Sequence, residues 1–214
     1  MSRGERMRSL RWVILVLFIV GGFFGASVGG MPFILGEVAH AAPLLQPPTP
    51  TPIPPYRIVI GEFRTRGTGK GDDEFVELFN PTGDSINIGG WKVMGSNKDG
   101  ETEPRYTFPS STVLLPGQHY LIVGSDYSGS VLGELGAELS SGIKDDGGIA
   151  LTLADGTTVI DAVGMDAGSA YKEGTTLTPL TSNLNRGYER LPRGSAGSCY
   201  DTENNASDFT LISP

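Results

Sequence analysis

Histidine and cysteine, the residue types that most often bind metals or act as nucleophiles, are nearly missing from this sequence. It holds two histidines, His40 and His119, and one cysteine, Cys199, among 214 residues. A single cysteine excludes a disulfide within the chain, so stability has to come from a packed core, in which we expect Cys199 to lie. No H-E-x-x-H or C-x-x-C spacing occurs, which disfavours a zinc site. His119 follows a predicted turn, where a structural or solvent-facing role is expected rather than that of a catalytic base.

Positive charge is also scarce. The chain has 16 lysines and arginines against 24 aspartates and glutamates, so its formal net charge is −8. Phosphate backbones repel a surface of this sign, and nucleic-acid binding is therefore not expected. Acidic side chains gather in predicted loops at residues 72–74 and 145–146. These loops are the leading candidates for chemistry, because binding and catalytic residues are often carried on loops.

The first 42 residues differ from the rest and have the features of an export segment. Four arginines precede an uncharged apolar run at residues 12–36, which is long enough to cross a bilayer as a helix. The arginines are Arg3, Arg6, Arg8 and Arg11. The positive-inside rule puts the N-terminus in the cytoplasm and the later residues outside. The sequence Ala-His-Ala at residues 39–41 offers a cleavage site, so residues 1–42 are predicted to be either a signal peptide or an N-terminal membrane anchor.

Residues 43–55 form a proline-rich linker, PLLQPPTPTPIPP. Proline fixes φ and lacks an amide donor, so this segment favours an extended polyproline II spacer. At about 3.1 Å per residue the spacer would reach about 40 Å, enough to hold a domain away from a membrane or wall. The domain is predicted to span residues 56–214 and to be extracytoplasmic, either secreted or anchored in the cytoplasmic membrane.

The densest pattern in this domain, at residues 74–93, is architectural. Val76 and Leu78 fall on one side of a half-buried strand, and the turn-forming sequence NPTG follows. Ile88 to Trp91 is an odd step, which would put these side chains on opposite faces of an unbroken strand. A bulge at the glycine pair between them would return Trp91 to the core side, so we expect Trp91 to be a buried anchor.

Turn residues recur along the rest of the domain. Pro116 and Gly117 hold the second and third positions of LPGQ, as in a type II turn. A two-residue turn at residues 155–156 would place Leu151 opposite Ile160 on one apolar face. Many short strands, 31 glycines, 15 prolines and no helical stretch predict an all-β, antiparallel β-sandwich. Its expected structural core residues are Val76, Leu78, Trp91, Pro116 and Gly117.

A run of arginines, NRGYERLPR, lies near the C-terminus. In a strand, Arg186, Tyr188 and Arg190 would share one face, with Arg193 close by. We interpret this run as a solvated edge strand whose charges discourage pairing with another chain, rather than as a ligand site.

A candidate metal loop follows this run. Asp201, Glu203 and Asn205 alternate in DTENNASD, and Asp208 lies further on. Alternating oxygen ligands are typical of calcium loops, so these four residues are the candidate calcium ligands. However, Ala206 stands where such a loop needs glycine, and no glutamate closes it. Hydrogen bonds that stabilise turns are the competing interpretation. No cofactor other than calcium is expected.

The order of several short motifs resembles that of the lamin tail domain, an immunoglobulin-like β-sandwich found in nuclear lamins and in many exported bacterial proteins. The motifs are FVELFN at 75–80, GGW at 89–91, YTFP at 106–109 and LPGQHYLIV at 115–123. The ending CYDTENNASDF is similar to the bacterial branch. The sequence shows no coiled-coil rod before the domain, so filament formation is not implied. The resemblance implies a non-catalytic interaction module, with no catalytic residue to carry over.

The expected function is therefore a non-catalytic, extracytoplasmic binding or interaction module. Its partner would be a protein or a cell-envelope component, and residues 12–36 would contact the membrane if they are not cleaved. Two other functions remain open: a secreted, metal-dependent hydrolase that uses the acidic loops, and a carbohydrate or cell-wall binding module. The latter would need exposed aromatic side chains, and Tyr127, Tyr171 and Tyr200 lie in loop-like sequence.

Overall fold

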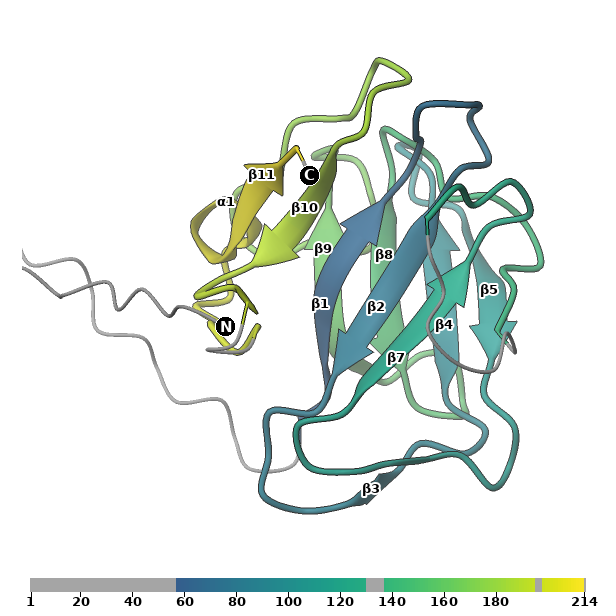
Figure 1. Ribbon diagram of the computed structural model, residues 1–214, viewed down its shortest axis with the longest axis vertical. Coiled ribbons are helices and arrows are strands. Elements are labelled where there is room, and N and C mark those ends of the chain that lie inside the picture. Colours follow the sequence, from purple (N-terminus) through teal and green to yellow (C-terminus); the bar gives the residue numbers. More distant parts are fainter. Residues whose placement is uncertain (1–56, 130–136, 195–197, 214) are drawn as a thin grey trace, which may run out of the picture. The chain divides into compact units, whose positions relative to one another are not determined.

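Two antiparallel β-sheets lie face to face in the computed structural model, which describes residues 57–129, 137–194 and 198–213 (Figure 1). The elements are β1 (Val59–Arg64), β2 (Phe75–Phe79), β3 (Ile86–Asn87), β4 (Lys92–Ser96), β5 (Thr102–Thr107), β6 (Val113–Leu114), β7 (His119–Val123), β8 (Gly148–Thr152), β9 (Val159–Gly164), β10 (Gly187–Arg190), α1 (Asn205–Asp208) and β11 (Phe209–Ile212). Apart from this single short helix, the regular elements of the described residues are all β-strands, which confirms the predicted all-β fold.

The larger sheet has five strands in the order β11-β10-β1-β2-β7, and the smaller has four in the order β5-β4-β8-β9. Neighbouring strands within both sheets pair antiparallel. β3 and β6 form a separate two-stranded ribbon. This arrangement is the antiparallel sandwich expected from many short strands joined by turns.

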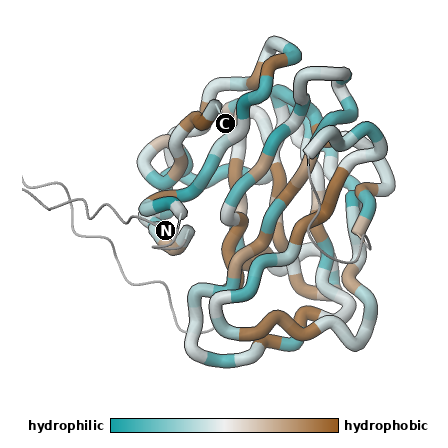
Figure 2. The backbone as a smooth tube through the Cα atoms, viewed as in Figure 1, coloured by the Kyte–Doolittle hydropathy of each residue, from teal (hydrophilic) through white to brown (hydrophobic). Residues whose placement is uncertain are grey.

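Apolar side chains from both sheets fill the space between them, and Figure 2 shows hydrophobic stretches on strands of both layers. Val76 and Leu78 on β2 are fully buried, as predicted. Phe63 on β1 is also fully buried, and its ring lies 5.6 Å from that of Tyr188 and 5.7 Å from that of Phe209. Burial of this apolar surface supplies the main driving force for folding.

Trp91, the predicted buried anchor, is partly buried and packs against the core at its margin. Ile88, three residues earlier, is fully buried instead. The amide of Trp91 donates to the carbonyl of Ile88 at 3.0 Å, which closes a turn around Gly89 and Gly90. Gly90 has a φ of 80°, a conformation that favours glycine. A turn rather than a bulge therefore separates β3 from β4, and Trp91 packs against the core from its margin.

The turn predicted around Pro116 and Gly117 is present, but both residues are exposed and do not belong to the core. The amide of Gln118 donates to the carbonyl of Leu115 at 3.0 Å. Gly117 has a φ of 70°, as the third position of a type II turn requires. The structural role of this pair is to redirect the chain into β7.

The β8–β9 hairpin follows the predicted register only beside its turn. Thr152 pairs with Val159, but the register shifts between Leu151 and Thr152, so Leu151 faces Asp161 instead of Ile160. A one-residue shift exchanges the two faces of a strand. The charged side chain of Asp161 consequently lies in the interior, with 0% exposure.

The predicted export segment, residues 1–42, and the proline-rich linker, residues 43–55, lie outside the described residues. Within the ranges that the structure describes, no helix has the length and apolar character needed to cross a membrane.

Candidate functional site

β10 is an interior strand, not the solvated edge strand that its arginines suggested. It pairs with β1 on one side and β11 on the other. The side chain of Arg190 is 0% exposed, and its Nη2 donates to both carboxylate oxygens of Asp161 on β9, at 2.9 and 2.8 Å. Its Nε donates to the carbonyl of Ile60 on β1 at 2.9 Å. A buried ion pair thus joins strands from both sheets.

The polar atoms of this pair have further partners. The amide of Ile60 donates to Asp161 Oδ2 at 2.6 Å, and Arg190 Nη1 donates to the carbonyl of Tyr200 at 3.0 Å. The ring of Phe209 lies 4.5 Å from the Arg190 guanidinium. Burial raises the pKa of Asp161, while Arg190 and the Ile60 amide oppose that rise by binding the ionised form. The pair is therefore a tightly satisfied structural element.

A second arginine, Arg57, extends this pair into a larger group of charges. Its guanidinium nitrogens lie 2.9 Å from Asp201, 2.7 Å from Glu203 and 3.2 Å from Glu173. Burial, reinforced by nearby Asp161 and Asp201, raises the pKa of Glu173 to about 8. We call the whole group the arginine–acid cluster: Arg57, Asp161, Glu173, Arg190, Asp201, Glu203 and Asp208.

Asp201 and Asp208, two of the predicted calcium ligands, hold the loop before α1 in shape. Asp208 Oδ1 accepts hydrogen bonds from the amide and the hydroxyl of Thr202 at 3.0 and 2.6 Å. Asp201 Oδ1 accepts one from the amide of Glu203, two residues on, at 3.1 Å. This last bond has the spacing of an Asx-turn, the competing interpretation of this sequence.

Asn205, a third predicted ligand, is fully buried and acts along the edge of β9. Its Oδ1 accepts from the amide of Gly164, and its Nδ2 donates to the carbonyl of Ala162, both at 2.9 Å. Arg57 Nε donates to the carbonyl of Ile160 on the same strand. A groove of about 620 Å³ follows this strand. Because side chains already occupy these outward backbone groups, the groove is poorly suited to binding an added β-strand.

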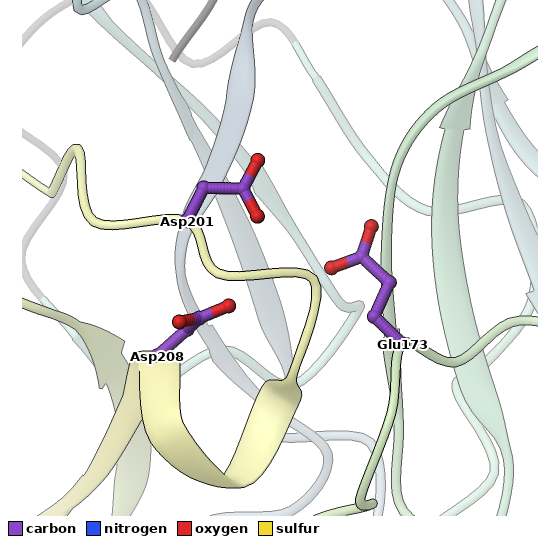
Figure 3. A group of neighbouring side chains, drawn as sticks. All are labelled: Glu173, Asp201 and Asp208. Atoms are coloured by element: carbon purple, nitrogen blue, oxygen red, sulfur yellow. The ribbon is translucent and has the colours of Figure 1, made fainter. Parts of the chain in front are cut away.

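Oxygens of Glu173, Asp201 and Asp208 lie within 4.8 Å of one another (Figure 3). Arg57 contacts Glu173 and Asp201, and Arg190 Nη1 lies 3.8 Å from Asp208. These guanidinium groups already supply the positive charge that the carboxylates require. A calcium ion at this place would have to displace Arg57, so the donor set does not fit calcium well.

The outward face of the five-stranded sheet carries three glutamates side by side, which we call the acidic row: Glu189 on β10, Glu62 on β1 and Glu77 on β2. The register places Glu62 directly opposite both of the others. Glu77 Oε1 lies 2.7 Å from His119 Nδ1, and Glu189 accepts from Arg193 Nε at 2.7 Å. Glu62 has no hydrogen bond or ion pair from its side chain within the described ranges. Like charges placed directly opposite one another destabilise a sheet.

The electrostatics of the acidic row centre on Glu62. Burial raises its pKa to about 7, and the charges of Glu77 and Glu189 add to the rise. Because the folded-state pKa of Glu62 lies above its ordinary value, protonation of Glu62 stabilises the fold. This stabilisation is present at low pH and is lost as the pH rises through 7. A cation brought against the row would favour the ionised form. The acidic row is therefore suited to a positively charged partner.

The tyrosines considered for sugar binding do not form an exposed platform. Tyr171 is buried, and Tyr200 is half-buried. Tyr127 packs edge-on against Phe75, with ring centroids 5.8 Å apart. Cys199 is free and half-buried, so it lies less deep than expected.

The described residues form an immunoglobulin-like β-sandwich. Its buried charges form ion pairs and hydrogen bonds that hold strands and loops together. The family model of the Lamin Tail Domain matches residues 51–167, more than half of the chain. The chain therefore belongs to the lamin tail domain family, and this membership indicates a non-catalytic interaction module with a protein partner. The match ends just after β9, so β10, α1 and β11 lie beyond it. No curated protein matches the chain.

Proposed function

We propose that this chain is a non-catalytic interaction module of the lamin tail type that works outside the cytoplasm, where its acidic row binds a positively charged segment of a protein partner. Glu62 carries this proposal, because its carboxylate has no ion pair or hydrogen bond among the described residues and lies between Glu77 and Glu189 on the outward face of the sheet. Complementary charge steers association and selects the partner.

An arginine holds one carboxylate of each acidic loop and also the buried Asp161 on β9, which supports this proposal over a hydrolase. The buried and half-buried pairs are Arg64 with Asp73, Arg66 with Asp145, and Arg190 with Asp161. A metal-dependent hydrolase needs carboxylates that can hold a metal or move a proton. We propose that the module needs no cofactor, calcium included. Metal-dependent turnover that is lost when an acidic loop is mutated would contradict this.

The double variant Glu62→Gln/Glu189→Gln should lose affinity for the partner by on the order of tenfold at low salt, because two charges at the contact are removed. A photo-cross-linker at Leu121, which lies opposite Glu77 on β7, would capture the partner in producing cells for purification. Titration calorimetry would then compare the variant with the original chain. Binding should also strengthen from pH 6 to pH 8, as Glu62 ionises.

The matched control is Asp84→Asn/Asp99→Asn, which removes two exposed charges elsewhere on the domain. This control should bind as the original chain does. Equal losses in both double variants would show that the net charge matters and the acidic row does not.

The extracytoplasmic location rests on the apolar run after the N-terminal arginines, and sequencing the N-terminus of the natural protein tests it. A start at Ala42 would mean release, whereas an intact run in the membrane fraction would mean tethering with the proline-rich linker as a spacer. In the tethered case, protease added outside the cytoplasmic membrane should remove the domain. A domain that resists until that membrane is breached would refute the proposed orientation.

A further inference from the structure

Glu74, a carboxylate outside the acidic row, lies at the bottom of a pocket. The pocket, of about 260 Å³, opens where β2 begins and β7 ends, beside the segment at residues 138–142. Its lining residues are Asp72, Glu74, Gly124, Ser125, Glu138, Leu139, Ser140, Ser141 and Gly142. Asp72, Glu138 and the three serines are exposed, while Glu74 and Leu139 are buried. The pocket thus has a polar rim above a buried acid.

Glu74 is held in place but only half satisfied. It is 2% exposed, and its Oε1 accepts a hydrogen bond from the amide of Ile143 at 2.9 Å. Its Oε2 has no hydrogen-bond partner within the described ranges. Within the described ranges this oxygen is not one of the fully buried side-chain atoms that lack a partner, so it is open to the pocket and free to accept a hydrogen bond from a bound donor.

The pocket is kept open over this carboxylate by glycine. A Cβ at Gly142 would lie 3.2 Å from Glu74 Oε2 and 3.3 Å from Glu74 Oε1. A side chain at position 142 would therefore cover the two oxygens. The rim is fixed as well, because Ser140 N donates to the carbonyl of Arg105 at 2.7 Å and Arg105 Nη1 donates to the Ser141 hydroxyl.

The chemistry of the lining selects the ligand. Three carboxylates and three hydroxyls face the pocket, and no lining residue is cationic. Within the described ranges, the acids whose oxygens lie close enough together to hold a metal ion belong to the arginine–acid cluster. The three carboxylates that line this pocket do not form such a group there. A ligand that reaches several separate acceptors must be larger than an ion and must carry several N–H donors. An ammonium group on a short alkyl chain has these properties.

We propose that this pocket binds the ammonium group of a lysine side chain or a similar primary alkylamine, with Glu74 Oε2 as its main acceptor and Asp72 and Glu138 at the rim. This site is independent of the acidic row, which lies on the outward face of the sheet. Burial raises the pKa of Glu74 to about 8, with Asp72 and Asp145 adding to the rise and Arg105 opposing it. Binding of a cation should therefore release a proton at neutral pH, and affinity should increase as the pH rises toward 8.

Titration of the full chain with Nα-acetyl-lysine amide tests the proposal, with Nα-acetyl-norleucine amide as the uncharged comparison and Ca²⁺ alone as the metal comparison. The lysine derivative should bind at least about tenfold more tightly than the norleucine derivative, because charge-assisted hydrogen bonds are the strong ones. Glu74→Gln should reduce affinity by a similar factor. Gly142→Ala, which fills the space over the carboxylate, should do so as well.

Asp84→Asn is the matched control, because it removes a negative charge after the opposite end of β2 and should leave affinity unchanged. Equal binding of the two derivatives, or no binding of either, would overturn the proposal. So would lysine binding that Gly142→Ala leaves intact, or binding of Ca²⁺ without binding of the amine. Loss of partner binding in the Glu62→Gln/Glu189→Gln variant with amine binding retained would separate this site from the acidic row.

Discussion

Replacing Asp161 with alanine should destabilise the domain by about 3–5 kcal/mol, because Arg190 loses the one carboxylate that it binds directly and keeps only Asp201 and Asp208 at 3.9 and 3.8 Å. The Arg190 guanidinium would lose both hydrogen bonds to the carboxylate, and the amide of Ile60 would lose its acceptor. None of these groups is near enough to solvent to find water as a replacement, since Arg190, Asp161 and Ile60 are all 0% exposed. Urea unfolding followed by circular dichroism would measure the loss.

The size of this effect depends on burial, and an exposed ion pair provides the control. Lys70 and Asp126 are 3.2 Å apart, with exposed fractions of 68% and 35%. Asp126→Ala should therefore cost less than about 1 kcal/mol. A double variant, Asp161→Leu/Arg190→Met, should recover part of what Asp161→Ala loses, because it removes the guanidinium that has lost Asp161, while the buried Asp208 loses its contact with Arg190. A loss below about 1 kcal/mol for Asp161→Ala would show that water reaches the pair.

The alternation of apolar residues predicted the sheets well, because each strand has one face on the core. Val76 and Leu78 needed only their spacing to be assigned to the interior. The same reasoning wrongly predicts that Arg190 is exposed, because charged side chains normally face solvent. Its partner Asp161 lies 29 residues away and faces inward only after the register shift in the β8–β9 hairpin. Neither the distant partner nor the shift has a signature in local sequence.

The candidate sites also depend on contacts between residues that are far apart in the sequence, which local spacing does not predict. Spacing along one loop predicts the calcium ligands, whereas the acids that meet in space include Glu173 from a different segment. Glu203 and Asn205 alternate with Asp201 in sequence, but one reaches Arg57 and the other turns to β9. The acidic row depends on cross-strand register, which sequence specifies only after the strand order is known. The sequence predicts that Glu74 belongs to an acidic loop, but it does not predict that this side chain is buried.

Truncation of Phe63 is the second change for which we expect a large loss of stability. Phe63→Ala should cost about 3–5 kcal/mol, because the side chain is fully buried and its removal leaves a cavity beside Tyr188 and Phe209. Trp91→Ala should cost less, about 1–3 kcal/mol, although tryptophan is the larger residue. Part of the Trp91 side chain remains in contact with water in the folded state, so less apolar area is lost from burial.

Chemical denaturation of both variants, followed by circular dichroism, decides the order. The signal should come from the sheets and not from tryptophan fluorescence, since one variant lacks Trp91. Trp91→Phe is the matched control, because it keeps an aromatic ring at the margin of the core and should recover most of the loss. If Trp91→Ala proved as costly as Phe63→Ala, the turn at Gly89 and Gly90 would be wrong and Trp91 would lie in the interior. Equal stability of Trp91→Ala and the original chain would instead mean that the packing of Trp91 against the core margin contributes nothing, and would free that side chain as a contact for a partner.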